Sequence, residues 1–294
     1  MIIREFPVSL NIDYPLVNEY KTEKIVFFDI ETTGLSAETS YLYLIGCIYM
    51  KDSYLHFIQW FSENVNEEAL LVRNFFEFIK DYDLLISYNG SGFDIPYLIK
   101  KCNMLKLDYS FSNIRILDLY KKISPVKRII KLDNYKQKTV ETFLNVKRED
   151  ILSGEELIEV YARYLGKRQI ERLKKSRKSS DIDDVSSEAD QLLYLLLLHN
   201  EDDIKGLVRI CPILYYSDLF GKTFHIIKAS VSNGELSVDL EYNFNIPYPV
   251  DFGNGDIRLS AVNNNVTVTI KTYEGELKYF YENYRDYFYL PEED

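Results

Sequence analysis

Two acidic residues stand one position apart at the end of a hydrophobic segment. Residues 25–28 have the sequence IVFF, and residues 29–34, which follow, have the sequence DIETTG. A run of β-branched and aromatic residues closed by a glycine predicts a buried strand, and residues i and i+2 of a strand lie on the same face. We therefore expect Asp29 and Glu31 to point in the same direction.

The chemistry that suits such a pair is the binding of a hard divalent cation. Two carboxylates held this close repel each other and resist removal from water, so a buried pair needs a compensating charge. Mg²⁺ and Mn²⁺ prefer carboxylate oxygens and can supply that charge. The alternative is a solvated strand end, where neighbouring acids cost little, and further acidic residues in the chain are needed to favour the metal.

Two other segments contain residues of the same kind. Residues 87–94, SYNGSGFD, place two glycines in an expected turn between a strand and a helix, where the backbone can approach a ligand and Asp94 begins the helix. Farther along, His199 and Asp203 are four residues apart on an expected helix and so share a face. The alternatives are that Asp94 only caps its helix and that His199 and Asp203 form an ordinary surface pair.

Together these residues resemble the three exonuclease motifs of the DEDD superfamily of 3′-to-5′ exonucleases, DnaQ-like proteins with a ribonuclease H-like fold. The matching residues, in motif order, are Asp29 and Glu31; Asn89, Gly90, Phe93 and Asp94; and His199 and Asp203. The resemblance covers about residues 22–212 and is closest to the YprB-like bacterial branch, through segments 147–150 and 198–200. Residues 131–135 and 140–144 resemble the stretch before the third motif in proofreading domains of family B polymerases.

The third motif departs from the usual pattern of the superfamily. That motif usually has a histidine five residues before the aspartate or a tyrosine four residues before it, and here His199 stands at the spacing of the tyrosine. An imidazole is nonetheless a competent base near neutral pH. Asp202 is a second candidate for the aspartate of this motif, and the helix spacing and the resemblance favour Asp203.

The resemblance implies hydrolysis of phosphodiester bonds with two divalent cations, Mg²⁺ or Mn²⁺. The residues that it implies as cation ligands are Asp29, Glu31, Asp94 and Asp203, with Asp29 shared between the two ions. His199 would take the proton from the attacking water. The residues expected to contact the substrate are Thr32, Gly34, Asn89 and Phe93.

Two basic segments stand out in a chain whose net charge is -11 at pH 7. Residues 121–138 contain seven lysines and arginines against one acid, and residues 163–178 contain eight against one. Although an acidic chain is unusual for a nucleic-acid binder, local basic segments in a chain with a carboxylate cluster favour a phosphate-bearing substrate. The alternative is a solvated helix face and a mobile loop.

The cysteines and the apolar segments bear on the location of the protein. Cys47, Cys102 and Cys211 are widely spaced, which argues against a disulfide framework or a zinc site and suits buried side chains in a reducing compartment. Residues 1–6 lack a signal-peptide pattern, and the most apolar stretch, 192–198, is far shorter than the ~20 residues of a membrane span. We expect a soluble cytoplasmic protein without a membrane partner.

Hydrophobic periodicity predicts an α/β fold in which strands come first and then alternate with helices. The expected strands cover about residues 24–30, 41–50, 53–61, 84–88 and 114–118. The expected helices cover about residues 66–80, 132–144, 154–165 and 187–210, with another from Asp94 and a polar loop at 174–188. With the resemblance, this order implies a ribonuclease H-like mixed five-stranded sheet flanked by helices.

The chain is expected to have three parts: an irregular N-terminal arm at 1–21, an exonuclease domain at 22–215 and a small β-rich appendage at 222–294. The appendage is expected to be antiparallel because residues 222–282 alternate with the strand period and residues 263–265, NNN, form a turn. Its end, 273–289, holds eight aromatic residues that could stack on unpaired bases. Packing against the main domain or a dimer contact is the commoner role of such residues.

These residues favour a metal-dependent nuclease, above all a 3′-to-5′ exonuclease that acts on single-stranded ends of DNA or RNA. A second possibility is a non-catalytic nucleic-acid-binding or scaffold protein on the same fold, although such a protein has no chemical need to keep four acids together. A third is an endonuclease of the ribonuclease H type, which would share the metal site. No residue pattern distinguishes DNA from RNA, because that choice depends on contacts to the 2′-hydroxyl.

Overall fold

The computed structural model describes residues 1–150, 152–177, 187–275 and 282–287. These residues form two units, of which the first comprises residues 1–222 with 244–248 and the second takes most of the C-terminal part of the chain. Each unit has its own β-sheet. The domain boundaries derived from the sequence remain a prediction.

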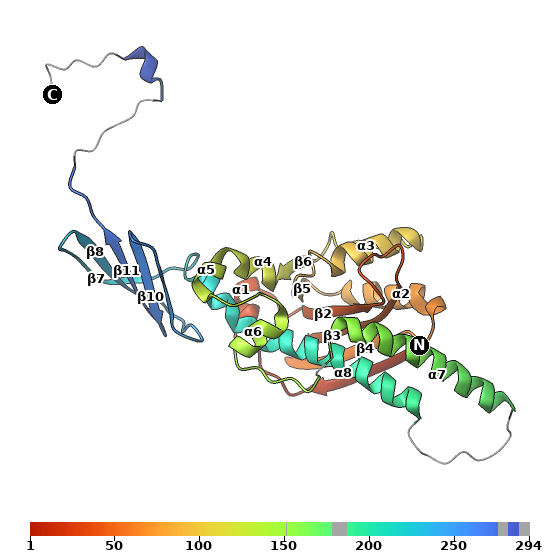
Figure 1. Cartoon of the computed structure of the whole chain (residues 1–294). Helices are drawn as coiled ribbons and strands as arrows, with labels where there is room; N and C mark the ends of the chain where they lie inside the picture. The colour runs from red at the N-terminus through yellow and green to blue at the C-terminus, as the bar shows by residue number, and fades with distance from the viewer. Residues whose placement is uncertain (151, 178–186, 276–281, 288–294) are drawn as a thin grey trace. The chain divides into compact units, whose positions relative to one another are not determined.

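The first unit is built on a six-stranded sheet with the order β1-β4-β3-β2-β5-β6 (Figure 1). Its strands are β1 (Ile2–Val8), β2 (Ile25–Thr32), β3 (Leu42–Lys51), β4 (Tyr54–Phe61), β5 (Leu84–Ser87) and β6 (Arg115–Asp118). The pairs β1–β4, β4–β3 and β3–β2 are antiparallel, whereas β2–β5 and β5–β6 are parallel. The central strands are apolar without alternation because both of their faces are covered. The predicted α/β class with a mixed sheet is confirmed.

The sheet has one strand more than the five predicted, because the N-terminal arm is not irregular. Residues 2–8 form the edge strand β1, which pairs with β4 along its whole length. The exposed positions of β1 include Ile3 and Pro7, so polar and apolar residues do not alternate there and the strand period is hidden in the sequence. A proline is tolerated in β1 because one side of an edge strand makes no ladder hydrogen bonds.

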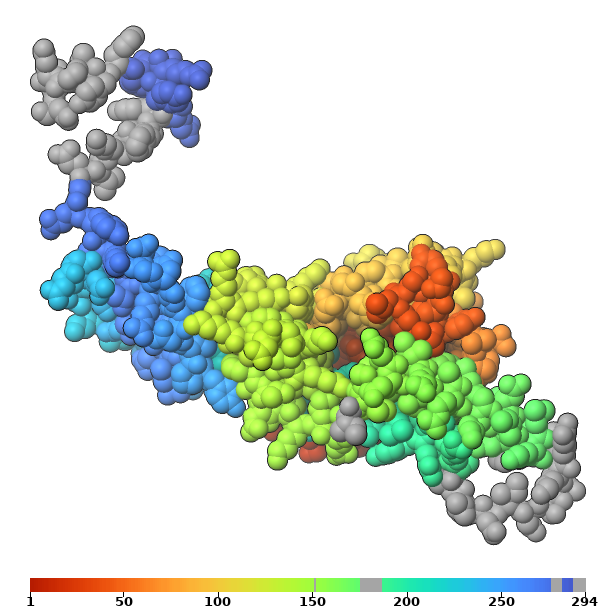
Figure 2. All heavy atoms as spheres, viewed as in Figure 1, coloured from red at the N-terminus to blue at the C-terminus, as the bar shows by residue number. Residues whose placement is uncertain are grey.

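Helices cover both faces of this sheet (Figure 1). They are α1 (Leu16–Tyr20), α2 (Glu68–Ile79), α3 (Asp94–Met104), α4 (Leu119–Ile123), α5 (Lys127–Ile130), α6 (Gln137–Phe143), α7 (Gly154–Arg177), α8 (Glu188–Arg209) and α9 (Leu214–Asp218). One hydrophobic core lies between the sheet and helices α2 and α3, with Phe28 and Phe75 among its buried side chains. A second core, which includes Leu44 and Leu196, joins α7 and α8 to the sheet. In the space-filling view, α7 in green and the segment from α4 to α6 in yellow-green share one face of this unit (Figure 2).

Two helix boundaries differ from the prediction. Helix α7 runs to Arg177 and not to about 165, so the first residues of the predicted polar loop are helical, while 178–186 lie outside the described residues. The second half of α7 is mostly charged and therefore shows no hydrophobic period. The helix predicted at 132–144 begins only at Gln137. Helix α8 begins where predicted, because Ser187 and Asp190 form a capping box.

The second unit is a five-stranded antiparallel sheet with the order β7-β8-β11-β10-β9. Its strands are β7 (His225–Ser232), β8 (Glu235–Glu241), β9 (Val250–Gly253), β10 (Ile257–Val262) and β11 (Asn265–Lys271). The predicted turn joins β10 to β11, and Asn263 in it has a φ of 55°, a left-handed conformation that asparagine tolerates. The predicted antiparallel β appendage is confirmed.

Three of the eight aromatic residues near the end of the chain lie in its described part. Tyr273, Tyr284 and Tyr287 are exposed. The other five, at 279–281, 288 and 289, lie outside the described residues. Base stacking and packing against another surface both stay predictions for this group.

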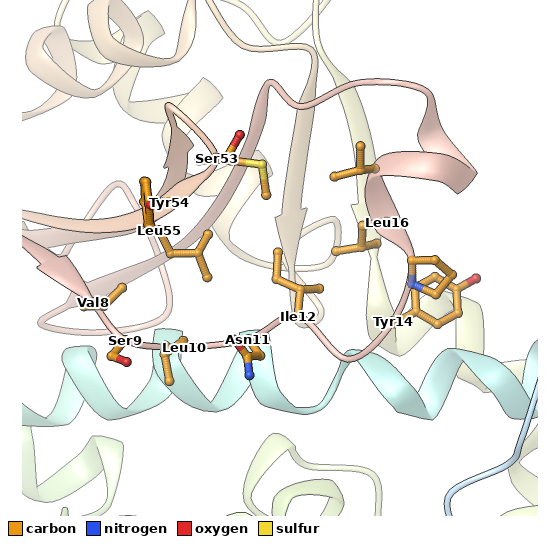
Figure 3. Close-up of a pocket in the computed structure, with 13 residues that line it drawn as sticks. Val8, Ser9, Leu10, Asn11, Ile12, Tyr14, Leu16, Ser53, Tyr54 and Leu55 are labelled. Carbon is orange, nitrogen blue, oxygen red and sulfur yellow. The ribbon is translucent and has the colours of Figure 1, made fainter.

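A cavity of about 520 Å³ lies beside the N-terminal segment. It is lined by most of residues 8–17 and, from the β3–β4 hairpin, by Met50 and residues 53–55 (Figure 3). Its lining contains no acidic, basic, histidine or cysteine side chain. The cavity therefore lacks the groups that metal binding or acid–base catalysis would use.

Cys47, Cys102 and Cys211 are buried with free thiols, as expected for cysteines that serve as small apolar side chains. Burial raises the pKa of all three thiols, so they are poor nucleophiles and poor metal ligands. In the described part of the chain, no helix combines the length and the apolarity that crossing a membrane requires.

Candidate metal and active site

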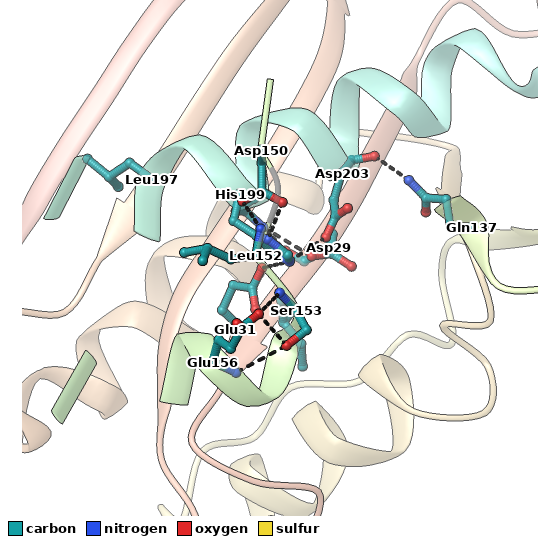
Figure 4. A network of polar contacts seen from close by, with 12 residues as sticks. Asp29, Glu31, Gln137, Asp150, Leu152, Ser153, Glu156, Leu197, His199 and Asp203 are labelled. Carbon is teal, nitrogen blue, oxygen red and sulfur yellow. Dashed lines mark hydrogen bonds and ion pairs between the residues drawn. The ribbon is translucent and has the colours of Figure 1, made fainter. Parts of the chain in front are cut away.

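Asp29 and Glu31 lie on β2 and face helix α8 (Figure 4). Phe28 and Ile30 pack into the core on the opposite side of the sheet, so strand alternation turns the two acids away from that core. On α8, Asn200 Nδ2 donates a hydrogen bond of 3.1 Å to Asp29 Oδ2, and His199 Nε2 lies 3.8 Å from Glu31 Oε1. The two acids therefore share a face, as the strand period predicted.

The close approach of α8 to the sheet depends on Gly46 of β3, which lies opposite Asp29 in the strand ladder. A Cβ atom at this position would overlap the side chains of Asn200 and Ile204. The glycine thus leaves the space through which Asn200 reaches Asp29.

Gly46→Ala should therefore destabilise the protein. Overpacking of this kind costs about 1–3 kcal/mol, and we expect a loss of that size in the free energy of unfolding measured by urea denaturation. Gly166→Ala is the matched control, because Gly166 is exposed on α7 with nothing within 4 Å of an added Cβ, and alanine is preferred in a helix by up to about 1 kcal/mol. Equal stability of Gly46→Ala and the unchanged protein would contradict the close contact.

His199 and Asp203 lie one turn apart on α8 and contact each other. His199 Nε2 is 3.1 Å from Asp203 Oδ2, as the helix spacing predicted. The other oxygen, Asp203 Oδ1, accepts a hydrogen bond of 2.5 Å from Arg148 Nη2. Asp202, the second candidate, instead accepts hydrogen bonds from the backbone amides of residues 149 and 150. Of the two aspartates, Asp203 is thus the one beside the histidine.

Asp94 begins α3 and reaches β2 through its backbone. Asp94 Oδ1 accepts a hydrogen bond of 3.3 Å from the amide of Ile30, the residue between the two acids of β2. The turn before Asp94 is held by Asp118 at the end of β6, which accepts hydrogen bonds from the amides of Asn89 and Ser91. The three acidic segments of the sequence therefore come together in the folded chain.

The loop that follows Glu31 is anchored to α2 and α3 by a buried ion pair. Lys101 Nζ on α3 lies 2.7 Å from Glu68 Oε1 on α2 and donates a hydrogen bond of 2.6 Å to the carbonyl oxygen of Ser40. Glu68 Oε1 also accepts a hydrogen bond of 2.8 Å from the amide of Leu42. Because each buried charge is both paired and hydrogen-bonded, the pair holds the loop against the two helices.

The four residues predicted to contact the substrate lie in the turns beside the acids. Thr32 Oγ1 donates a hydrogen bond of 2.8 Å to the carbonyl oxygen of Gly34 within the first turn. In the second turn, Asn89 is exposed and has a φ of 60°. The ring of Phe93 is partly buried and packs 5.6 Å from the ring of Tyr97, centroid to centroid. Contact with a substrate stays a prediction for all four.

Burial raises the pKa of three of the four acids. It raises the pKa of Glu31 to about 8 and that of Asp94 to about 7, and it shifts the pKa of Asp29 in the same direction. The charges of the neighbouring acids add to the effect at all three sites. The acids therefore hold protons unless another positive charge meets them, which is the electrostatic condition that favours a bound cation.

Asp203 and His199 form the charged part of the cluster. Burial would raise the pKa of Asp203, but the hydrogen bond from His199 and the charges of His199 and Arg148 lower it. Burial would lower the pKa of His199, but its hydrogen bond to Asp203 and the charges of three neighbouring acids raise it to about 9. Without a metal ion, His199 is therefore protonated at neutral pH.

The donor set fits a hard divalent cation. Glu31 Oε1 is buried and has no hydrogen-bond partner among the described residues. One ligand atom each from Glu31, His199 and Asp203 lie within 4.8 Å of one another, and the charges of Asp29 and Asp94 act on this group. A buried oxygen without a partner is costly, and Mg²⁺ and Mn²⁺ prefer such oxygens.

The cluster also contains three side chains that no motif spacing predicted: Arg148, Asp150 and Asn200. They make hydrogen bonds to Asp203, His199 and Asp29, respectively. The only signal for them in the sequence was the family resemblance of the two segments that contain them. That resemblance gave them no role.

The basic run predicted at 163–178 is largely paired with acids over residues 163–174, the part whose side chains the structure describes. Four of its side chains form ion pairs with acids on other elements: Arg163, Lys167, Arg168 and Arg172. These acids are Glu63, before α2, and Glu188 and Asp190, at the start of α8. Because the charges help to dock α7, this run is a weaker candidate for binding phosphate than residues 121–138.

A family model of the RNase H superfamily, RNase_H_2, matches residues 26–215, the part of the chain that holds the mixed sheet and the acids. The match covers more than half of the chain. The chain therefore belongs to this RNase H-like family, the YprB-like branch that its motifs resemble, and the predicted family is confirmed.

The chain is also similar to DNA polymerases from two archaea. It is 30% identical to the enzymes of Thermococcus aggregans and Pyrococcus glycovorans over 127 residues, which covers 35% of this chain. The chain spans only 7% and 16%, respectively, of the length of these relatives. A similar solved structure is the family B DNA polymerase of Pyrobaculum calidifontis, with a TM-score of 0.44, 14% identity, and coverage of 79% of this chain and 37% of that chain.

Proposed function

We propose that this chain is a metal-dependent nuclease that acts as a 3′-to-5′ exonuclease on single-stranded ends. The observation that carries the proposal is the meeting of two acids of β2 with Asp94 of α3 and with His199 and Asp203 of α8. Membership in the RNase H superfamily supports a nucleic-acid substrate, as does the similarity to DNA polymerases. The proposed direction of hydrolysis, from the 3′ end toward the 5′ end, rests on the resemblance to the DEDD exonucleases.

The groups that would hold two divalent cations are Asp29, Glu31, Asp94 and Asp203, with Asp29 shared. When bound, Mg²⁺ or Mn²⁺ would supply Lewis-acid activation and neutralise the charge that develops on the phosphate. His199 Nε2 faces Glu31 and Asp203 and would accept the proton of the attacking water. Because the acids are what raise the pKa of His199, cations on these acids would return the imidazole toward its neutral, basic form.

A cavity beside the acids supports a single-stranded substrate. It has a volume of about 450 Å³ and is lined by Tyr88, Asn89, Tyr120, Tyr135, Lys136 and Gln137. Gln137 Nε2 donates a hydrogen bond of 2.7 Å to the carbonyl oxygen of Asp203, and Asn89 stands in the turn before Asp94. The cavity therefore adjoins two of the three acidic segments.

The lining of this cavity suits an unpaired base and its phosphate. Lys127 Nζ lies 3.9 Å from the ring centroid of Tyr120 and 4.9 Å from that of Tyr135. Tyrosine rings can stack on any base, and lysines beside them can meet the backbone of the strand. Lys136 lines the cavity and Lys127 contacts two of its rings, and both belong to the basic segment at 121–138.

Tyr120→Leu should weaken the binding of a single-stranded oligonucleotide by roughly 10-fold, since the loss of one stacking ring costs about 1–3 kcal/mol. Fluorescence anisotropy with a labelled oligonucleotide in Ca²⁺ measures this affinity. Tyr54→Leu is the control, because Tyr54 is 73% exposed at the start of β4 and does not line this cavity. Equal affinity of the Tyr120 and Tyr54 variants would remove the base-stacking role.

End-labelled single-stranded DNA and RNA, incubated with the purified protein and Mn²⁺, test the proposed function directly. A ladder that shortens from the 3′ end is the expected result, and the preferred strand identifies the sugar. Cutting of a circular single strand would identify an endonuclease instead. No hydrolysis of any strand together with no Mn²⁺ binding in calorimetry would favour a non-catalytic nucleic-acid-binding or scaffold protein.

A further inference from the structure

His199 is held by carboxylates at both of its ring nitrogens. Its Nδ1 atom is 2.7 Å from Asp150 Oδ2, and its Nε2 atom is 3.1 Å from Asp203 Oδ2 and 3.8 Å from Glu31 Oε1 (Figure 4). Both His199 and Asp150 are buried, at 5% and 8% exposure. The hydrogen bond to Asp150 is therefore sheltered from water, and it lies on the side of the ring away from the cation-binding acids.

Asp150 is itself held in place on α8. Asp202 Oδ2 accepts hydrogen bonds of 2.7 Å from the amides of both Glu149 and Asp150. Asp150 Oδ1 accepts a hydrogen bond of 3.1 Å from the amide of Leu152. The second oxygen, Oδ2, remains for the imidazole, with Lys138 Nζ 3.4 Å away.

The neighbouring residue in the same segment holds Asp203. Arg148 binds both oxygens of Glu141, at 3.0 and 2.9 Å, and it also binds Asp203 Oδ1. Arg148 Nη2 lies 3.6 Å from Asp150 Oδ2. The segment 148–150 thus supplies one partner to each of the two functional side chains of α8.

The bond to Asp150 decides which nitrogen of the neutral ring carries its proton. Carboxylates can only accept hydrogen bonds, and both ring nitrogens face one. Cations on Glu31 and Asp203 would engage the oxygens of these acids, so Asp150 is then the acceptor left for the ring proton: Nδ1 donates and Nε2 keeps a free lone pair. That lone pair then faces Glu31 and Asp203, where the reacting water would lie. In the opposite tautomer an N–H group would face the acids, and the ring could not accept a proton there.

We propose that Asp150 is a positioning residue that holds His199 in the Nδ1-protonated tautomer, with Nε2 as its working atom. The inference rests on the proposed nuclease function, in which His199 is the base. The competing explanation is structural: Asp150 would only accept the hydrogen bond from the amide of Leu152 through its Oδ1 atom. The two explanations separate because they use different oxygens of the same carboxylate.

Asp150→Asn and Asp150→Ala distinguish them. The side-chain amide introduced by Asp150→Asn would still accept the hydrogen bond from the Leu152 amide through its oxygen, but it would present an NH₂ group to Nδ1, which favours the wrong tautomer. We expect a fall in kcat on the order of 10²-fold or more for Asp150→Asn and about 10-fold for Asp150→Ala, with KM little changed. A structural role predicts that Asp150→Ala loses more activity than Asp150→Asn, because alanine cannot accept the hydrogen bond from Leu152.

A double-mutant cycle with His199→Ala tests whether Asp150 acts through the imidazole. In the His199→Ala background, Asp150→Asn should cause no further loss of kcat. Glu156→Gln is the matched control, since Glu156 binds Ser153 in the same loop and makes no contact with the imidazole. An equal loss from Asp150→Asn in both backgrounds would overturn the proposal.

A spectroscopic readout makes the test independent of hydrolysis. The chain has three histidines, so ¹H–¹⁵N spectra of the full chain labelled at histidine contain three ring systems, and His199→Ala identifies one. With Mg²⁺ present, His199 should show a protonated Nδ1 and a bare Nε2, and Asp150→Asn should reverse this. The same tautomer in both proteins overturns the inference. If the spectra are as expected but the protein hydrolyses no strand, the proposed nuclease function is overturned and the positioning role of Asp150 is not.

Discussion

Asp29→Asn should lose on the order of 10³-fold of the Mn²⁺-dependent hydrolysis rate, equivalent to about 4 kcal/mol, while the protein stays folded. Asparagine has the size of aspartate, and its oxygen can still accept the hydrogen bond from Asn200 that Asp29 Oδ2 accepts. What it removes is the negative charge that we propose both cations share. Of the four acids, Asp29 is therefore the one whose neutralisation should affect both cations.

The rate on end-labelled single-stranded DNA and the heat of Mn²⁺ binding measure this effect. Asp83→Asn is the matched control, because Asp83 is an exposed acid before β5 whose side chain accepts a hydrogen bond from Thr22, away from the four acids. We expect that control to keep its activity. Undiminished hydrolysis by purified Asp29→Asn would exclude the assigned site.

The same substitution should make the metal-free protein more stable at neutral pH. Burial raises the pKa of Asp29, Glu31 and Asp94, so each of these acids resists ionisation in the folded chain when no cation is bound. Asparagine does not ionise, so the substitution removes that penalty at one of the three sites. We expect a higher free energy of unfolding and a higher Tm when no metal ion is bound.

The pH dependence of this gain follows from the direction of the shifts. A carboxyl group with a higher pKa in the folded chain stabilises the fold below its unfolded pKa and loses that contribution as the pH rises through its folded value. With folded values of about 8 for Glu31 and about 7 for Asp94, the loss extends from about pH 4 to 8. The pKa of Asp203 is lowered, so Asp203 stabilises the fold above its unfolded pKa and loses that contribution only as the pH falls below it.

Thermal unfolding in EDTA at pH 5 and pH 8 measures this. The Tm of the unchanged protein should be lower at pH 8 than at pH 5. The Tm of Asp29→Asn should exceed that of the unchanged protein by more at pH 8 than at pH 5. Adding Mn²⁺ at 100 times its Kd should stabilise the unchanged protein by about 2.7 kcal/mol and the variant much less. A variant that is less stable than the unchanged protein in EDTA at pH 8 would contradict the electrostatic account.

The centre of the fold was predictable because its strands carry a plain local signal. Strands β2, β3 and β5 are apolar runs that end at polar or glycine-containing segments, and their burial on both faces follows from that composition. Strand β1 gives no such signal, because its polar and apolar residues do not alternate. It is a strand because it pairs with β4. The second half of α7 is likewise held by ion pairs to acids on other elements, which no local period reveals.

The acids of the site were predictable for a different reason, namely that their spacing is local. Asp29 and Glu31 share a strand, and His199 and Asp203 share a helix. Their partners are distant in the chain: 55 residues separate Arg148 from Asp203, and 49 separate Asp150 from His199. Such contacts arise only when the segment 148–150 docks on α8, and a single sequence does not reveal that docking.

Lys101 belongs to the same helix as Asp94, and its ammonium group binds the loop that follows Glu31. These contacts of Lys101 therefore tie the first acidic segment to α3. In such a preorganised site the conformational entropy is lost during folding and not again when a strand binds. On binding, it is then mainly the nucleic acid that would lose conformational entropy. A strand would be selected by its fit to acids that are already in place.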